Sequence, residues 1–162
     1  MHLQGGGAMA EHDFARILLM VEGTDAGMAA ARSAIGLSAN QGAELMMMAV
    51  VDTRTLKQLL SNRIFVEEEM EEYEEEMHTS ARRQMDYVTQ LATEAQVDYR
   101  TNLVKGACHT CVLEKLRDNS SDLLIMGAFR ATQVKTDLMA REKQLILDET
   151  PCPVMLVPAP GD

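Results

Sequence analysis

Short apolar runs alternate along this chain with longer segments of helical periodicity, and this alternation limits the fold to a few classes. Continuous apolar runs of four to eight residues are typical of strands that are covered on both faces of a parallel sheet. Four such runs are RILLMV at residues 16–21, ELMMMAVV at 44–51, DLLIM at 122–126 and VMLV at Val154–Val157. Residues 97–104 have a mixed pattern, which predicts a further strand at a sheet edge.

The segments between these runs have the features of helices. The first begins near Ala26 behind a cap at Thr24 or Asp25, and Gly42 is placed to end it in a left-handed conformation. Further helices are predicted over residues 66–91, 108–117 and 140–149, while 55–65 is irregular or a short helix and 128–139 is a loop. In the first of these helices, apolar residues recur every three or four positions and are expected to face the core: Val66, Met70, Tyr73, Met77, Ala81, Met85, Val88 and Leu91. Strands that alternate with helices in this way predict an α/β fold, with a parallel sheet and helices on both faces.

The chain is expected to be one cytoplasmic domain. Its 162 residues suit a single domain, which we place at residues 14–158 between a disordered tail at 1–13 and a short tail at 159–162. No apolar run approaches the roughly 20 residues that span a bilayer, and no secretory signal is visible. Three cysteines are an odd number, which does not indicate a disulfide framework.

Negative charge is concentrated in one segment. The net charge is −10, and without the eight glutamates between residues 67 and 76 it would be −2. Binding to nucleic acid or to an anionic membrane requires a basic surface, so neither is predicted as a partner. The acidic helix at residues 66–78 is most simply a solvated face. Docking of an unidentified basic protein partner stays open.

Three motifs give the chain a family resemblance. ILLMVEGT at residues 17–24, DLLIMG at 122–127 and TPCPVMLVP at 150–158 together resemble the universal stress protein family. The resemblance implies a three-layer fold of the adenine nucleotide alpha hydrolase-like type, with a five-stranded parallel sheet in the order 3-2-1-4-5. It also implies a homodimer that often forms through the last strand, here Val154–Val157. An exposed apolar edge strand is suited to such pairing.

The resemblance directs attention to the crevice between the first and fourth strands. In open α/β sheets, ligands bind at the carboxyl ends of the strands, where the strand order reverses. The candidate cofactor-binding residues are Glu22, Gly23, Thr24, Val50, Gly127, Arg130, Ala140 and Arg141. The family usually has an aspartate that contacts the nucleoside at the position of Glu22, and Asp52 at the end of the second strand is expected nearby.

The phosphate-binding loop of the family is altered in this chain. ATP-binding members carry Gly-x2-Gly-x9-Gly-Ser/Thr after the fourth strand, and here only Gly127 matches. Arg130, Ala140 and Arg141 occupy the other three positions. Side chains obstruct the close approach of phosphate to backbone amides that glycines allow. We therefore expect no cofactor, and predict a non-enzymatic, dimeric stress-response or regulatory module with weak or absent ATP binding.

Two alternatives remain beside that prediction. Arg130 and Arg141 could bind the phosphate of ATP or AMP through their charge and guanidinium geometry, in a nucleotide-binding switch or slow ATPase. Cys108 and Cys111 have the spacing of half a zinc site, but no second pair exists, so no metal is predicted. We expect these thiols to pack on the sheet. A thiol-based sensor is the third hypothesis, because a helix N-terminus lowers the pKa of a thiol.

Overall fold

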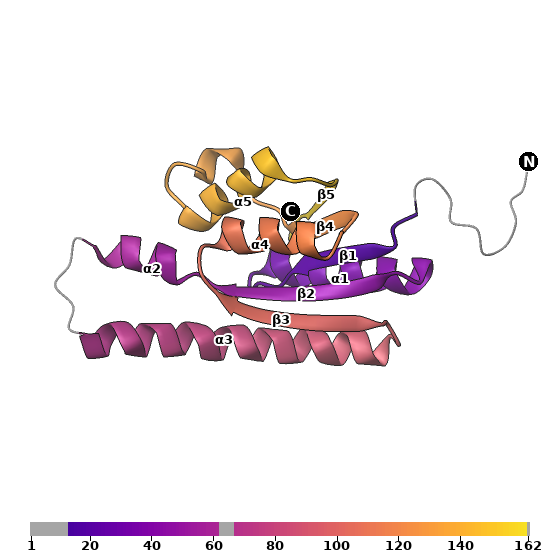
Figure 1. The fold of residues 1–162 in the computed structure, drawn as a ribbon, viewed down its shortest axis with the longest axis horizontal. Helices are drawn as coiled ribbons and strands as arrows, with labels where there is room; N and C mark the ends of the chain where they lie inside the picture. Colours follow the sequence, from indigo (N-terminus) through magenta and orange to yellow (C-terminus); the bar gives the residue numbers. More distant parts are fainter. Residues whose placement is uncertain (1–12, 62–66, 162) are drawn as a thin grey trace, which may run out of the picture.

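The structure is a computed structural model that describes residues 13–61 and 67–161. The predicted N-terminal tail therefore lies outside the described residues, except for Asp13. The elements in chain order are β1 (Arg16–Met20), α1 (Asp25–Gln41), β2 (Glu44–Val51), α2 (Thr53–Leu60), α3 (Glu67–Glu94), β3 (Tyr99–Lys105), α4 (Cys108–Asp118), β4 (Leu123–Gly127), the short 3-10 helix η1 (Ala131–Gln133), α5 (Leu138–Glu149) and β5 (Val154–Val157) (Figure 1).

The five strands form one parallel sheet in the order β3-β2-β1-β4-β5, which confirms the predicted topology. Leu18 of β1 is in register with Met46 of β2 on one side and with Leu124 of β4 on the other. β3 forms one edge, as its mixed pattern predicted, and β5 forms the other. Because all strands run in the same direction, their carboxyl ends meet at one edge of the sheet.

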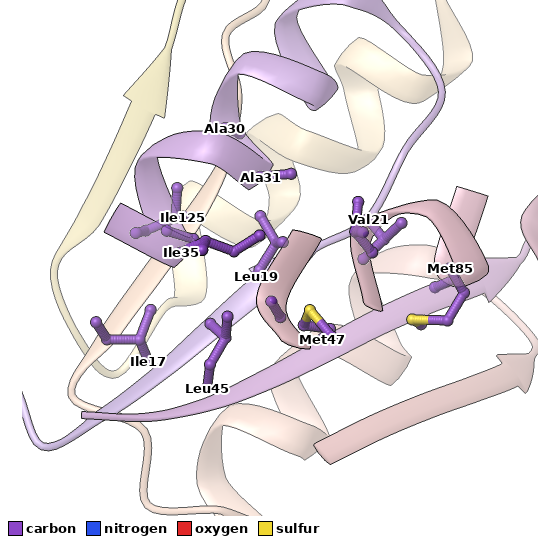
Figure 2. Close-up of a cluster of buried hydrophobic side chains, with 14 of the residues drawn as sticks. Ile17, Leu19, Val21, Ala30, Ala31, Ile35, Leu45, Met47, Met85 and Ile125 are labelled. Carbon is purple, nitrogen blue, oxygen red and sulfur yellow. The ribbon is translucent and has the colours of Figure 1, made fainter. Parts of the chain in front are cut away.

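Helices cover both faces of the sheet, as predicted. One core cluster joins Ile17, Leu19 and Met47 to residues of α1 and α3, and Figure 2 shows these side chains gathered between the strands and the helices. The second cluster joins Leu18 and Met48 to residues of α4 and α5 on the opposite face. Successive residues of a strand point to opposite faces, so each apolar run supplies both clusters.

Three element boundaries differ from the predictions for local reasons. α2 forms a regular helix from Thr53, two residues before the predicted segment 55–65. Residues 62–65 of that segment lie outside the described residues. α5 begins at Leu138 rather than Ala140, because the carboxylate of Asp137 accepts hydrogen bonds from its first-turn amides. β3 begins at Tyr99, two residues late, after Gln96 takes a positive φ of 58°.

α3 is buried only in its second half. Ala81, Met85 and Val88 pack on the sheet as predicted, but Tyr73, which the same periodic stripe placed inside, is 43% exposed. The prediction for Tyr73 is wrong because the first half of α3 extends past the carboxyl ends of the strands, where no sheet lies beneath it (Figure 1). Within the described residues, no helix combines the length and the apolar character needed to cross a bilayer.

Candidate functional site

The loop after β1 brings three of the predicted residues to the carboxyl edge of the sheet. Thr24 is the N-cap of α1, and its hydroxyl accepts a hydrogen bond from the amide of Gly27 at 3.0 Å. The same hydroxyl donates to Oε1 of Glu22 at 3.3 Å. Glu22 therefore does not cap α1 itself, and its carboxylate is directed toward the space between β1 and β4.

Lys143 of α5 fills that space with its ammonium group. Its Nζ lies 2.8 Å from Oε2 of Glu22 and donates to Oε1 of Glu22 and to the carbonyl of Gly127, both at 2.9 Å. The side chain of Lys143 is only 5% exposed and that of Glu22 is 14% exposed. A buried ammonium is tolerated only with a charged partner and hydrogen bonds. The chain supplies both at the point where the strand order reverses.

Two glycines allow α1 to pack directly against the end of β4. A Cβ atom on Gly127 would lie 2.7 Å from the amide nitrogen of Gly27, and one on Gly27 would lie 2.6 Å from the carbonyl oxygen of Glu22. Both distances are shorter than van der Waals contact, so neither position has room for a side chain. Gly127, the one position of the family's loop that matches, thus has a packing role in this chain.

The N-terminus of α4 is occupied by two buried carboxylates. The amide of Cys108 donates to Oδ2 of Asp52 at 2.9 Å, which places Asp52 near the crevice as expected. The amide of His109 donates to Oε1 of Glu142 at 3.1 Å, and its Nδ1 lies 2.9 Å from both oxygens of that carboxylate. First-turn amides favour anions, and here the protein supplies the anions itself.

The N-terminus of α5 is also satisfied internally. Oδ1 of Asp137 accepts hydrogen bonds from the amides of Met139 at 2.9 Å and Ala140 at 3.3 Å. Ala140 is buried, whereas Arg130 and Arg141 are exposed. The guanidinium of Arg141 donates to the carbonyl of Lys135 at 3.4 Å. The structure therefore brings Glu22 and Gly127 together but leaves both arginine side chains toward solvent.

A small cavity remains beside these groups. Its volume is about 110 Å³, below the roughly 300 Å³ at which ligand pockets begin. Glu22, Gly23 and Val50 of the predicted set line it, together with Met20, Val21, Ala49, Ala81, Gln84, Cys108 and Met139. The cavity is thus too small for a nucleotide while the surrounding side chains keep these positions.

The cysteines do not have the surroundings of reactive thiols. Burial raises the pKa of Cys108 far above its ordinary value, and the neighbouring carboxylates of Asp52 and Glu142 add to the rise. Burial also raises the pKa of Cys111. A thiol sensor needs the opposite shift, and Cys108 packs in the core as expected. In the part of the chain that the structure describes, no three His, Cys, Asp or Glu side chains are placed so that they could hold one metal ion.

Sequence reasoning missed Lys143, Glu142 and Asp137. Ala140, Lys143 and Ile146 recur every three residues and are all buried, so Lys143 lies on the inward stripe of α5. A lysine within an apolar helical stripe is the signal that could have identified it, because a lysine is almost never fully buried without a partner. The identity of that partner had no local signal, since Glu22 lies 121 positions away.

Both the sequence and the fold of this chain have relatives among known proteins. The sequence model described as the universal stress protein family matches residues 13–158. Universal stress protein MJ0531 of Methanocaldococcus jannaschii is 23% identical over 150 residues, which cover 93% of this chain and 85% of that protein. The solved structure of hypothetical protein MJ0577 is 18% identical with a TM-score of 0.72, covering 93% of this chain and 99% of its own.

Two further solved structures with this fold contain nucleotides. A universal stress protein in complex with cAMP is 15% identical with a TM-score of 0.62, over 90% of this chain and 97% of its own. A universal stress protein family protein of Arabidopsis thaliana with AMP bound is 12% identical with a TM-score of 0.61, over 91% and 94%. At these identities the structural likeness establishes the α/β fold.

Proposed function

This chain belongs to the universal stress protein family, and we propose that it acts there as a non-enzymatic, dimeric stress-response or regulatory module with weak or absent ATP binding. The observation that carries this proposal is the buried ion pair of Lys143 and Glu22, which lies against the carbonyl of Gly127. The protein's own charges occupy the place at which a ligand of an open α/β sheet would bind.

A phosphate group in this crevice would have to displace internal partners. The ammonium of Lys143 is engaged by Glu22, and the first-turn amides of α5 are engaged by Asp137. Each displacement leaves a carboxylate beside the incoming negative charge. Removing one partner of a buried ion pair costs roughly 3–5 kcal/mol, so the intact pair opposes phosphate binding at this edge.

The proposal also includes a homodimer and a place in the cytoplasm. Met155 and Leu156 of β5 are large apolar residues with exposed fractions of 37% and 38%, and β5 forms an edge of the sheet. A second copy of β5 would cover both side chains and pair the open edge.

All three cysteines are free thiols, which supports a reducing compartment such as the cytoplasm.

The second candidate function is a nucleotide-binding switch or slow ATPase that uses Arg130 and Arg141 as phosphate ligands. Two observations favour it. Both arginines are exposed on the segment that follows β4, and solved structures with the same fold contain AMP or cAMP. In this version the phosphate would bind outside the crevice, through guanidinium groups rather than through backbone amides.

Isothermal titration calorimetry with ATP and Mg²⁺ tests the proposed function. We expect a dissociation constant above about 0.1 mM, which corresponds to a binding free energy weaker than about −5.5 kcal/mol. The variant Arg130→Gly/Ala140→Gly/Arg141→Ser restores the family's loop, and we expect it to bind at least as tightly as the wild type. A low-micromolar dissociation constant for the wild type would contradict the proposal.

The variant Arg141→Ala separates the two candidate functions. If the wild type binds ATP or AMP and Arg141→Ala abolishes that binding, the arginine-based alternative is supported. Arg117→Ala provides the matched control, because Arg117 is an exposed arginine in the last turn of α4. Equal losses in both variants would indicate nonspecific attraction of the anion and would count against a site at Arg141.

A further inference from the structure

An open groove lies beside the first half of α3, next to the end of β2. Its volume is about 350 Å³, which falls within the range of roughly 300–1,000 Å³ for small-molecule sites. Its lining includes Val50 and Val51 of β2 and Tyr73, Glu76, Met77 and Ala81 of α3. The groove is thus larger than the cavity at Glu22 and differs from it in composition.

The groove forms where the apolar face of α3 continues beyond the end of the sheet. Tyr73, Met77 and Ala81 follow one another at four-residue intervals, which places them on one face of α3. Ala81 is buried, Met77 is half-buried and Tyr73 is 43% exposed. Figure 1 shows the cause, since this end of α3 projects past the carboxyl ends of the strands. An aromatic ring and a flexible thioether therefore form the wall of the groove.

The rim of the groove is negatively charged. Glu76 lines it and belongs to the segment with eight glutamates. Among the described residues, no salt bridge includes Glu76, whereas Glu74 is paired with Lys105 at 3.1 Å. The ammonium of Lys143 is likewise engaged by Glu22. The carboxylate of Glu76 therefore attracts cations to this hollow and repels phosphates and carboxylates.

The apolar floor of the groove continues toward the smaller cavity. Val50, Ala81 and Gln84 line both spaces. The side chain of Gln84 lies against Gly23 and donates from Nε2 to the hydroxyl of Ser80 at 3.1 Å. The side chain of Gln84 therefore lies between the two spaces. It is a polar group with apolar surface on both sides.

We propose that this groove binds a small organic ammonium compound with an apolar body. The ammonium group pairs with the carboxylate of Glu76 and lies against the ring of Tyr73, which attracts cations through its π-face. The apolar body covers Val50, Met77 and Ala81, where methionine adapts its shape to the ligand. Glu76 and Tyr73, which would recognise the ammonium group, do not line the cavity at Glu22.

Three probes of one shape and different charge test the proposal on the full chain. They are phenethylamine, 2-phenylethanol and phenylacetate, followed by ¹H–¹³C NMR of the methyl groups of Met77, Val50 and Val51. We expect phenethylamine to bind about three- to tenfold more tightly than the alcohol, from an exposed ion pair and a cation–π contact. Phenylacetate should not shift these methyl signals.

Two variants show whether Glu76 is responsible. Glu76→Gln should reduce the affinity for phenethylamine to that for the alcohol, while Glu75→Gln should leave it unchanged. Glu75 is the adjacent glutamate and lines a different hollow, together with His78 and Lys105. Equal binding of the amine and the anion, an unaltered affinity in Glu76→Gln, or the absence of shifts at the groove methyl groups would each overturn the proposal.

Discussion

The crevice beside Gly127 and the groove beside Tyr73 lie at the same edge of the sheet, yet they differ in how their polar groups are satisfied. At the crevice, Lys143 and Glu22 form an ion pair that fills the centre, and Lys143 also donates to the carbonyl of Gly127. At the groove, Glu76 has no salt-bridge partner among the described residues and an aromatic ring is half exposed. Under the two proposals made above, this fold closes its usual ligand position and leaves a neighbouring hollow open.

The largest expected effect comes from breaking the pair that closes the crevice. Lys143→Met leaves Glu22 without its partner at a mostly buried position, and we expect a loss of roughly 3 kcal/mol in the free energy of unfolding. Urea denaturation followed by circular dichroism measures this loss. The double variant Lys143→Met/Glu22→Gln should recover part of the stability, because it removes the uncompensated charge.

The exposed pair of Arg16 and Glu44 supplies the control for that experiment. Its atoms lie 3.4 Å apart, and the two side chains are 50% and 53% exposed. Glu44→Gln should cost less than about 1 kcal/mol, as is usual for surface ion pairs. If Lys143→Met costs no more than Glu44→Gln, the crevice is not closed by a strong internal pair and the contrast between the two regions fails.

A smaller effect is expected from placing a side chain at the end of β4. Gly127→Ala would put a Cβ atom 2.7 Å from the backbone of Gly27, and overpacking of this kind costs roughly 1–3 kcal/mol. Gly36→Ala in α1 is the matched control, because a Cβ atom there meets nothing within 4 Å. Alanine in that helix should stabilise the protein by about 0.5–1 kcal/mol. Thermal unfolding of both variants measures the difference.

The result for Gly127→Ala also distinguishes two roles of that glycine. A glycine that serves only phosphate binding would tolerate alanine without loss of stability in the absence of ligand. A glycine that serves packing would not. Equal stability of Gly127→Ala and the wild type would therefore contradict the close approach of α1 to β4.

Much of the fold could be predicted because its signals are local. The apolar runs at Glu44–Val51 and Val154–Val157 coincide with β2 and β5, because short continuous apolar runs favour strands. The start of α5 was less predictable, because it depends on the single cap Asp137. Tyr73 was misplaced because periodicity shows which face of a helix is apolar, but not where the sheet beneath it ends.

The candidate site was only partly predictable because its decisive contacts are distant in sequence. Comparison with the family's loop identified Arg130, Ala140 and Arg141, but the directions of their side chains depend on the backbone path after β4. The contacts of Lys143 with Glu22 and of Glu142 with His109 join residues 121 and 33 positions apart. No periodic pattern encodes such pairs, although a charged residue in a buried stripe indicates that one must exist.

The most direct measurement of a closed crevice is the ¹⁵N NMR signal of the Lys143 ammonium, assigned with the variant Lys143→Arg. An ammonium that is buried and bound to Glu22 and Gly127 exchanges slowly with water, so we predict a visible signal that saturating ATP and Mg²⁺ leave unchanged. Loss or a large shift of that signal on adding the nucleotide would show that the pair yields to phosphate, and would contradict the account.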